Sequence, residues 1–187
     1  MTLYQPKSLD FGFIILTPDN NPALLKYTVN SIKRNYPNQS HLCVVGDSIN
    51  PDVLKELKII SPVVKGRDTI TSLINAGMKK GHKGWNVIVM CGCWVHGGLD
   101  RKFSYFLESE KDVIFPIIAN YNREGKPVEI FSNFMDCTLN GILIHQKTFK
   151  EVGDMTDDSL EKSRMMWAAT AIDMGCKFKS VLGVKII

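Results

Sequence analysis

Asp19, Asp47, Cys91 and Cys93 are the residues best suited to ligand chemistry, and each follows a short apolar run of the sequence. Short apolar runs that stop at polar or small residues are typical of buried parallel strands. In open α/β sheets, ligands bind just beyond the carboxyl ends of such strands. We therefore predict that Asp19, Asp47 and the Cys91–Cys93 turn line one crevice, where carboxylates can accept hydrogen bonds from a ligand.

Strands and helices that alternate along the chain must position this crevice. We predict strands near 11–16, 42–46, 62–65, 85–90, 113–119, 140–144 and 178–187. We predict helices near 22–35, 51–58, 99–108, 148–152 and 159–174, another that begins after Asp68 or Thr69, and a turn at 123–127 that indicates either a hairpin or a mobile loop. The alternation favours an α/β fold with a mostly parallel central sheet and helices on both faces. No linker or repeat divides the chain, so we expect a single domain over residues 1–187.

The composition narrows the class of protein. The chain has 187 residues, of which 44% are hydrophobic and 22% charged, as in an ordinary globular domain. A formal charge of +4 suits an anionic small ligand but is too small to indicate nucleic acid. We see no transmembrane segment and no signal peptide. The odd number of cysteines, five, favours reduced thiols and a cytoplasmic location.

Several motifs, taken together, resemble family 2-type glycosyltransferases of the GT-A fold. The residues that carry the resemblance are 14–25 (Ile-Ile-Leu-Thr-Pro-Asp-Asn-Asn-Pro-Ala-Leu-Leu), 44–48 (Val-Val-Gly-Asp-Ser), 75–77 (Asn-Ala-Gly), 85–99 and 140–153, which ends in Phe-Lys-Glu-Val-Gly. Their order and spacing cover about residues 11–183. The resemblance implies a GT-A-like, nucleotide-diphospho-sugar transferase fold and transfer of a sugar from a nucleotide-sugar donor, a uridine diphosphate sugar, to an unidentified glycan or small-molecule acceptor.

The resemblance also assigns residues to the donor site. The nucleotide-sugar-binding candidates are Thr17, Asp19, Asp47, Arg67, Asn75, Cys91, Cys93 and Trp94. Asp47 and Thr17 are expected to hold the base and Asp19 the nucleoside, because a carboxylate at a strand end can accept from a uracil-like ring N–H. Arg67 stands just before a predicted helix and is expected to face the diphosphate, since anions favour that location. Trp94 follows the Cys91–Cys93 turn directly and is expected to form a wall of the pocket.

The sequence departs from the family at both of its acidic motifs. The Asp-x-Asp position, whose carboxylates hold a divalent cation in the family, reads Cys91-Gly92-Cys93. The resemblance implies a divalent cation, Mn²⁺ or Mg²⁺, but these ions prefer oxygen ligands and thiols are poor substitutes. The later acidic pair falls on Ser163-Arg164, which leaves the upstream Asp157 and Asp158 as candidates for the catalytic base. These losses keep a second interpretation open, a catalytically degenerate nucleotide- or glycan-binding module.

Simpler interpretations accompany each candidate. Aspartate after a strand is usually a turn or cap residue, and Arg67 is most simply a solvated arginine. The Cys-x-Cys-x-x-His spacing that ends at His96 suggests zinc only if a fourth ligand exists, for which Cys137 is the candidate. The sequence has no serine-hydrolase elbow, P-loop or dinucleotide-binding loop, which argues against those enzyme classes.

Overall fold

The computed structural model describes residues 9–38, 41–47, 49–59, 69–116, 118–121, 127–131, 140–156 and 159–181. The strands are β1 (Phe11–Leu16), β2 (Leu42–Val45), β3 (Trp85–Met90), β4 (Asp112–Pro116), β5 (Ile118–Tyr121), β6 (Pro127–Phe131), β7 (Ile142–His145) and β8 (Lys177–Val181). The helices are α1 (Pro22–Asn35), α2 (Pro51–Glu56), α3 (Ile70–Lys80), α4 (Leu99–Phe106), α5 (Gln146–Val152) and α6 (Leu160–Asp173).

Six strands form the central sheet, in the order β2-β1-β3-β7-β4-β8. β1 pairs in parallel with β2 and β3, and β4 pairs in parallel with β8. Only β7 runs against its neighbours β3 and β4. The predicted mostly parallel sheet is therefore confirmed, and β1, β2 and β3 point their carboxyl ends toward the same edge of the sheet.

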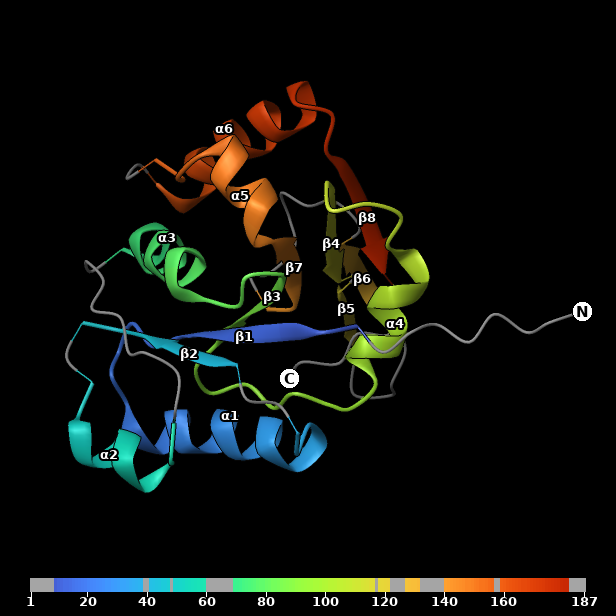
Figure 1. Ribbon diagram of the computed structural model, residues 1–187. Helices are drawn as coiled ribbons and strands as arrows, with labels where there is room; N and C mark the ends of the chain where they lie inside the picture. The colour runs from blue at the N-terminus through green and yellow to red at the C-terminus, as the bar shows by residue number, and fades with distance from the viewer. Residues whose placement is uncertain are drawn as a thin grey trace, which may run out of the picture.

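Helices cover both faces of this sheet (Figure 1). α1 and α2 lie on one face, and α3, α5 and α6 lie on the other. Alternate residues of β1 feed the two apolar cores: Ile14 and Leu16 pack with α3 and α6, whereas Phe13 and Ile15 pack with α1. All residues of β1 are buried, which explains why its sequence is a continuous apolar run instead of an alternating one.

Local sequence signals determine where α1 begins and how closely α3 packs against β1. Asn21 caps α1, with its side-chain oxygen accepting from the backbone N–H of Ala23 at 3.0 Å, and Pro22 occupies the first turn as predicted. A Cβ on Gly77 would lie 2.4 Å from Cγ2 of Ile14. Glycine at this position therefore lets α3 approach β1 directly.

The second half differs from the prediction in one place. The strand predicted over 113–119 is wrong as a single element, because β4 ends at Pro116 and β5 belongs to a separate two-stranded sheet. Proline lacks the N–H that a continuing ladder would need. The antiparallel pairing of β5 with β6 confirms the hairpin interpretation. The strand predicted near 62–65 lies outside the described residues.

None of the helices in the described ranges is long and apolar enough to cross a bilayer.

Candidate functional site

The carboxyl ends of the first three strands meet at one edge of the sheet. Leu16 is in register with Val45 of β2 and with Met90 of β3. Immediately beyond them, the N–H of Thr17 donates to the carbonyl of Val45 at 2.8 Å, and the N–H of Cys91 donates to that of Leu16 at 2.8 Å. The structure therefore brings the three predicted turns side by side.

Gly46 allows the turn after β2 to pack closely against the turn after β1. A Cβ on Gly46 would lie 2.7 Å from Cγ2 of Thr17, 2.7 Å from Oδ1 of Asn20 and 2.8 Å from the carbonyl oxygen of Thr17. Asn20 itself has φ 47°, a left-handed conformation that asparagine tolerates better than most residues. Because Asp47 follows Gly46 directly, its backbone lies next to the turn that carries Asp19.

Asp19 and Asp47 are both exposed at this edge. Neither carboxylate has an ion-pair partner within the part of the chain that the structure describes. Cys91 Sγ lies 4.0 Å from the carbonyl oxygen of Asn21, in the turn that carries Asp19, and the charge of Asp19 contributes to the raised pKa of the Cys91 thiol. Two accessible carboxylates at the ends of adjacent strands can accept hydrogen bonds from ring N–H or hydroxyl groups of a ligand.

Cys91 and Cys93 are half-buried free thiols. Burial raises the pKa of the Cys91 thiol, and the hydrogen bond with the side chain of Thr17 opposes this shift only in part. Burial likewise raises the pKa of Cys93, against the hydrogen bond with the side chain of Asn140. Both thiols are therefore protonated at neutral pH.

A protonated thiol is a poor ligand for a hard cation, because metal binding requires the deprotonated sulfur and Mg²⁺ or Mn²⁺ prefer oxygen. Cys91 and Cys93 thus do not fit the cation that the family holds at this position. Across the described ranges, no three His, Cys, Asp or Glu side chains are grouped so as to hold a metal ion. Cys137, the fourth zinc ligand considered from the sequence, lies outside these ranges.

A polar stripe on α1 holds the segment that follows β3. The N–H of Gly92 donates to Oγ1 of Thr28 at 2.9 Å, and the N–H of Val95 donates to Oγ of Ser31 at 2.9 Å. Both hydroxyls come from buried residues of α1. This stripe was not foreseen from the sequence, yet it determines where the Cys91–Cys93 turn lies.

Trp94, within the same segment, packs against α1. Its ring centroid lies 5.2 Å from that of Tyr27, and the guanidinium carbon of Arg34 lies 6.0 Å from the Trp94 ring centroid. A cation over an indole face is attracted by the negative face of the ring. These contacts account for the packing of Trp94 against α1. Its predicted role as a wall of the pocket stays a prediction.

Asn75 braces α3 against the connection between α5 and α6. Its Nδ2 donates to the carbonyl of Met155 at 2.8 Å, and its Oδ1 accepts from the N–H of Met155 at 2.9 Å. On the other side, Oγ of Ser163 donates to the carbonyl of Thr156 at 2.6 Å. The connection is therefore fixed to α3 and α6 just before the positions of Asp157 and Asp158.

Asn140 joins the site although the sequence analysis did not single it out. Its Oδ1 accepts from the N–H of Met90 at 2.6 Å, and its side chain is the hydrogen-bond partner of Cys93. The only signal in the sequence is the Asn-Gly pair before β7, with Gly141 in a left-handed conformation at φ 86°. Arg67, Asp157 and Asp158 lie outside the described residues, so their roles stay predictions.

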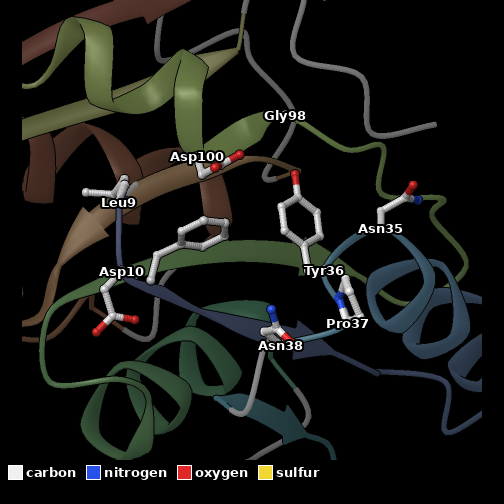
Figure 2. A pocket seen from close by; sticks show the side chains of 9 residues that line it. Leu9, Asp10, Asn35, Tyr36, Pro37, Asn38, Gly98 and Asp100 are labelled. Carbon is white, nitrogen blue, oxygen red and sulfur yellow. The ribbon is translucent and has the colours of Figure 1, made fainter. Parts of the chain in front are cut away.

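A hollow of about 530 Å³ lies at the opposite edge of the sheet, where β1 begins and α1 ends (Figure 2). It is lined by Leu9, Asp10, Phe11, Asn35, Tyr36, Pro37, Asn38, Gly98 and Asp100. The Tyr36 hydroxyl donates to the carbonyl of His96 and accepts from the N–H of Leu99, both at 2.9 Å. Burial raises the pKa of Tyr36 to about 12. This tyrosine therefore holds loop backbone, and the hollow is separate from the predicted crevice.

Comparisons with protein-family models and with curated protein sequences find no match. Solved structures do match. The crystal structure of S. aureus TarS 1–349 has a TM-score of 0.65 and 12% identity, covering 95% of this chain and 58% of that chain. TarS 1–349 in complex with UDP matches with a TM-score of 0.65 and 11% identity, over the same shares of the two chains.

A third match is 4-diphosphocytidyl-2C-methyl-D-erythritol synthase from Anaerococcus prevotii, with a TM-score of 0.60 and 12% identity. It covers 95% of this chain and 90% of that chain, whereas the chain spans only 58% of TarS 1–349. Likeness at these identities speaks to the fold alone. Together with the observed strand order, it shows that the chain has the predicted GT-A-like, nucleotide-diphospho-sugar transferase fold.

Proposed function

We propose that the edge formed by β1, β2 and β3 binds a uridine diphosphate sugar and that the chain transfers its sugar to an acceptor. The observation that carries the proposal is the convergence of the Thr17–Asn20, Gly46–Asp47 and Cys91–Cys93 turns at the carboxyl edge of a GT-A-like sheet. Ligands of open α/β sheets bind at this edge. The UDP complex of TarS, a protein of similar fold, supports the choice of nucleotide.

In this proposal the two exposed carboxylates recognise the nucleoside. Asp47 accepts from the ring N–H of uracil, and Asp19 accepts from the ribose hydroxyls. Thr17 is buried beneath them and its N–H donates to the carbonyl of Val45 at 2.8 Å, so it joins the first turn to β2 and positions the base. Asn75 contributes as a positioning residue, because both polar groups of its amide bond to Met155.

The transfer step follows the chemistry of an inverting reaction. A carboxylate, for which Asp157 and Asp158 are the candidates, takes the proton from the acceptor hydroxyl. The acceptor oxygen then forms a bond to the anomeric carbon while the bond between that carbon and the diphosphate oxygen breaks. The diphosphate leaves with the electron pair and needs a cationic partner, for which Arg67 is the candidate because the Cys91–Cys93 turn does not fit a hard cation.

The second candidate is a module of the same fold that binds a nucleotide or glycan without turnover. The protonated thiols of Cys91 and Cys93 favour it, because they replace the acids that the related family uses. The two candidates differ in turnover and share the binding site. They are separated by incubating the purified chain with uridine diphosphate sugars and measuring release of UDP.

Isothermal titration with UDP, CDP, GDP and ADP, with and without Mn²⁺, tests the shared claim. We expect UDP to bind and the Asp47→Ala variant to lose at least about tenfold in affinity, which corresponds to one charge-assisted hydrogen bond. Asp173→Ala, which removes an exposed carboxylate at the end of α6, is the matched control and should bind as the unmodified chain does. If none of the nucleotides binds, the transferase and the nucleotide-binding form of the module are both wrong, and only a glycan-binding module is left.

Turnover then decides between the candidates. UDP release by the unmodified chain that is abolished in Asp47→Ala supports the transferase. Binding without UDP release supports the module, and in that case Cys91→Asp combined with Cys93→Asp tests whether restoring two acids creates Mn²⁺-dependent activity.

A further inference from the structure

A second hollow, of about 520 Å³, lies between the end of α3 and the start of α5. It is lined by Lys79, Lys80, Gly81, Lys83, Gln146, Lys147 and Lys150. Five lysines therefore surround one concavity, and they come from two separate segments of the chain, 79–83 and 146–150. We call this group of residues the lysine hollow.

The lysine hollow lies at the edge of the sheet opposite to the proposed donor site. Lys83 precedes β3 closely, and Gln146 follows β7, which runs antiparallel to β3 with Trp85 opposite His145. The N–H of Gln146 donates to the carbonyl of Gly84 at 2.9 Å, which joins the two segments directly. A ligand here would thus be distinct from one bound beyond the carboxyl ends of β1, β2 and β3.

The charges around the lysine hollow are only partly compensated. Lys79 pairs with Asp154, and Lys147 pairs with Glu110 at 3.1 Å. The other members, Lys80, Lys83 and Lys150, are exposed, and within the described residues none of them has a hydrogen bond or ion pair from its side chain. Three positive charges therefore face solvent around one concavity, in a chain whose formal net charge is only +4.

Glu151 adds one more negative charge near these lysines. It is exposed next to Lys150 and acts on Lys147 through space, as one of the groups that raise the Lys147 pKa after the hydrogen bond to Glu110. With Glu110 and Asp154 already paired, Glu151 offsets one of the three remaining charges. An excess of positive charge is left at the lysine hollow.

Buried amides hold the scaffold beneath the lysines. Gln146 is only 5% exposed, and its Nε2 donates to the carbonyl of Met78 at 3.0 Å. Asn86 is fully buried and bonds both the N–H and the carbonyl of His82 at 2.8 Å. A Cβ on Gly81 would lie 2.5 Å from Oδ1 of Asn86, so this turn packs closely on its support. The backbone that presents the lysines is therefore preorganised.

Helix chemistry alone does not explain the cluster. Lys79 and Lys80 occupy the last turn of α3, where basic side chains interact favourably with the helix dipole. Lys83 lies beyond the helix, and Lys147 and Lys150 belong to another helix whose start meets the same concavity. Lys150 likewise lies in the last turn of α5, so the helix dipole accounts for Lys79, Lys80 and Lys150 but not for Lys83 and Lys147.

We propose that the lysine hollow binds a small polyanion that carries at least two phosphate groups. Lysine is an effective phosphate binder as a point charge, and a concave site concentrates the field of several such charges on one ligand. A concavity suits a compact anion that enters it, whereas docking on a membrane would call for charges on a flat or protruding face. The proposal is independent of the donor site.

Titration with inorganic tripolyphosphate at low salt tests the proposal. The test variant combines Lys80→Gln, Lys83→Gln and Lys150→Gln, which removes the three lysines without ion pairs and keeps most of each side chain. The charge-matched control combines Lys55→Gln, Arg101→Gln and Lys177→Gln, three exposed residues outside the lysine hollow. Circular dichroism and UDP titration of each variant show whether the fold and the donor site are intact.

We expect the test variant to lose about tenfold or more in tripolyphosphate affinity, while the control changes by no more than about twofold. Hydrogen exchange of the unmodified chain should show protection by tripolyphosphate at 79–83 and 146–150. Equal losses in the two variants would show attraction by net charge and would overturn the proposal. Binding to phosphatidylglycerol vesicles without binding of tripolyphosphate would overturn it in favour of a membrane surface.

Discussion

The two edges of the central sheet differ in the chemistry that they present. At the carboxyl edge of β1, β2 and β3, two exposed carboxylates and two protonated thiols stand on turns that are fitted closely together. At the amino edge of the same strands, lysines surround a concavity that rests on buried amides. The first edge offers hydrogen-bond acceptors and the second offers positive charge.

The two proposals therefore assign ligand sites of opposite character to opposite edges of one sheet. Exposed carboxylates that have no ion-pair partner within the described residues suit the neutral, donor-rich parts of a nucleoside. Lysines without acidic partners suit phosphate groups. The comparison also separates the two proposals, because substitutions at one edge should leave ligand binding at the other edge unchanged.

Gly46→Val should have the largest effect because its side chain would enter the turn after β1. The Cβ would lie 2.7 Å from Cγ2 of Thr17 and 2.8 Å from the carbonyl oxygen of that residue. We expect a loss of about 3 kcal/mol in the free energy of unfolding, measured with urea, together with loss of UDP binding. Gly97→Val is the control, since the nearest atom there is 3.7 Å away. Equal destabilisation by both variants would show that the close fit at Gly46 is unimportant.

Asp112→Asn tests the amino edge, where β4 begins. The buried carboxylate accepts from the N–H of Glu108 at 2.6 Å and from Nζ of Lys179 at 3.0 Å. Burial pushes the pKa of Asp112 upward, but these bonds and that from the N–H of Ser109 outweigh burial and hold the pKa below 3.8. We expect the substitution to lower the free energy of unfolding by about 2 kcal/mol at pH 7.

The loss of stability caused by Asp112→Asn should depend on pH. Because the folded-state pKa of Asp112 is depressed, its contribution to stability is fully present above pH 3.8 and declines as pH falls through the folded-state pKa. Urea unfolding from pH 6 down to pH 2 should therefore show a smaller gap between the unmodified chain and Asp112→Asn at the acid end. A gap that widens with acid would contradict the assigned pKa direction.

Asn75→Ala should have a smaller effect, confined to the connection between α5 and α6. The substitution removes both hydrogen bonds to the backbone of Met155, for an expected loss of about 1 kcal/mol in the free energy of unfolding. Amide exchange at Met155 should become faster, while exchange in β1 should rise only by the amount that the global loss of stability accounts for. The control is Asn38→Ala on the exposed surface. Unchanged exchange at Met155 would show that Asn75 is not the brace.

The smallest effect concerns the reactivity of the thiols at the carboxyl edge. Burial raises the pKa values of Cys91 and Cys93 above 9.0, so their alkylation by iodoacetamide should be slow at pH 7 and should rise only above pH 9. Peptide mapping by mass spectrometry after timed alkylation gives the rate for each cysteine. Rapid labelling of either residue at pH 7 would contradict a protonated thiol.

The strands and helices of the first half were predictable because their signals are local. The continuous apolar run of β1 and the Asn21-Pro22 start of α1 depend only on neighbouring residues. The break after Pro116 was missed because residues 113–119 are an apolar run with no turn residue besides the proline. Such a run can form one strand or two. The outcome depends on pairing with distant segments, because β4 pairs with β8 whereas β5 pairs with β6.

The candidate site was predictable only in outline. Strand ends bring Asp19, Asp47 and Cys91 to one edge by topology alone. The contribution of Asn140 depends on an antiparallel β7 beside β3, which no local pattern encodes. The lysine hollow likewise joins residues from α3 and α5, and in the sequence the 79–83 stretch is indistinguishable from a solvated basic turn.

Amide hydrogen exchange with and without UDP tests the central claim most directly, because it reports where on the molecule the nucleotide binds. We expect protection at 17–20, 46–47 and 91–93, the three turns beyond β1, β2 and β3, and no change at 79–83 or 146–150. The Asp47→Ala variant should lose this protection. Protection by UDP at the lysine hollow, with the three turns unchanged, would contradict the assignment of the donor site to the carboxyl edge of the sheet.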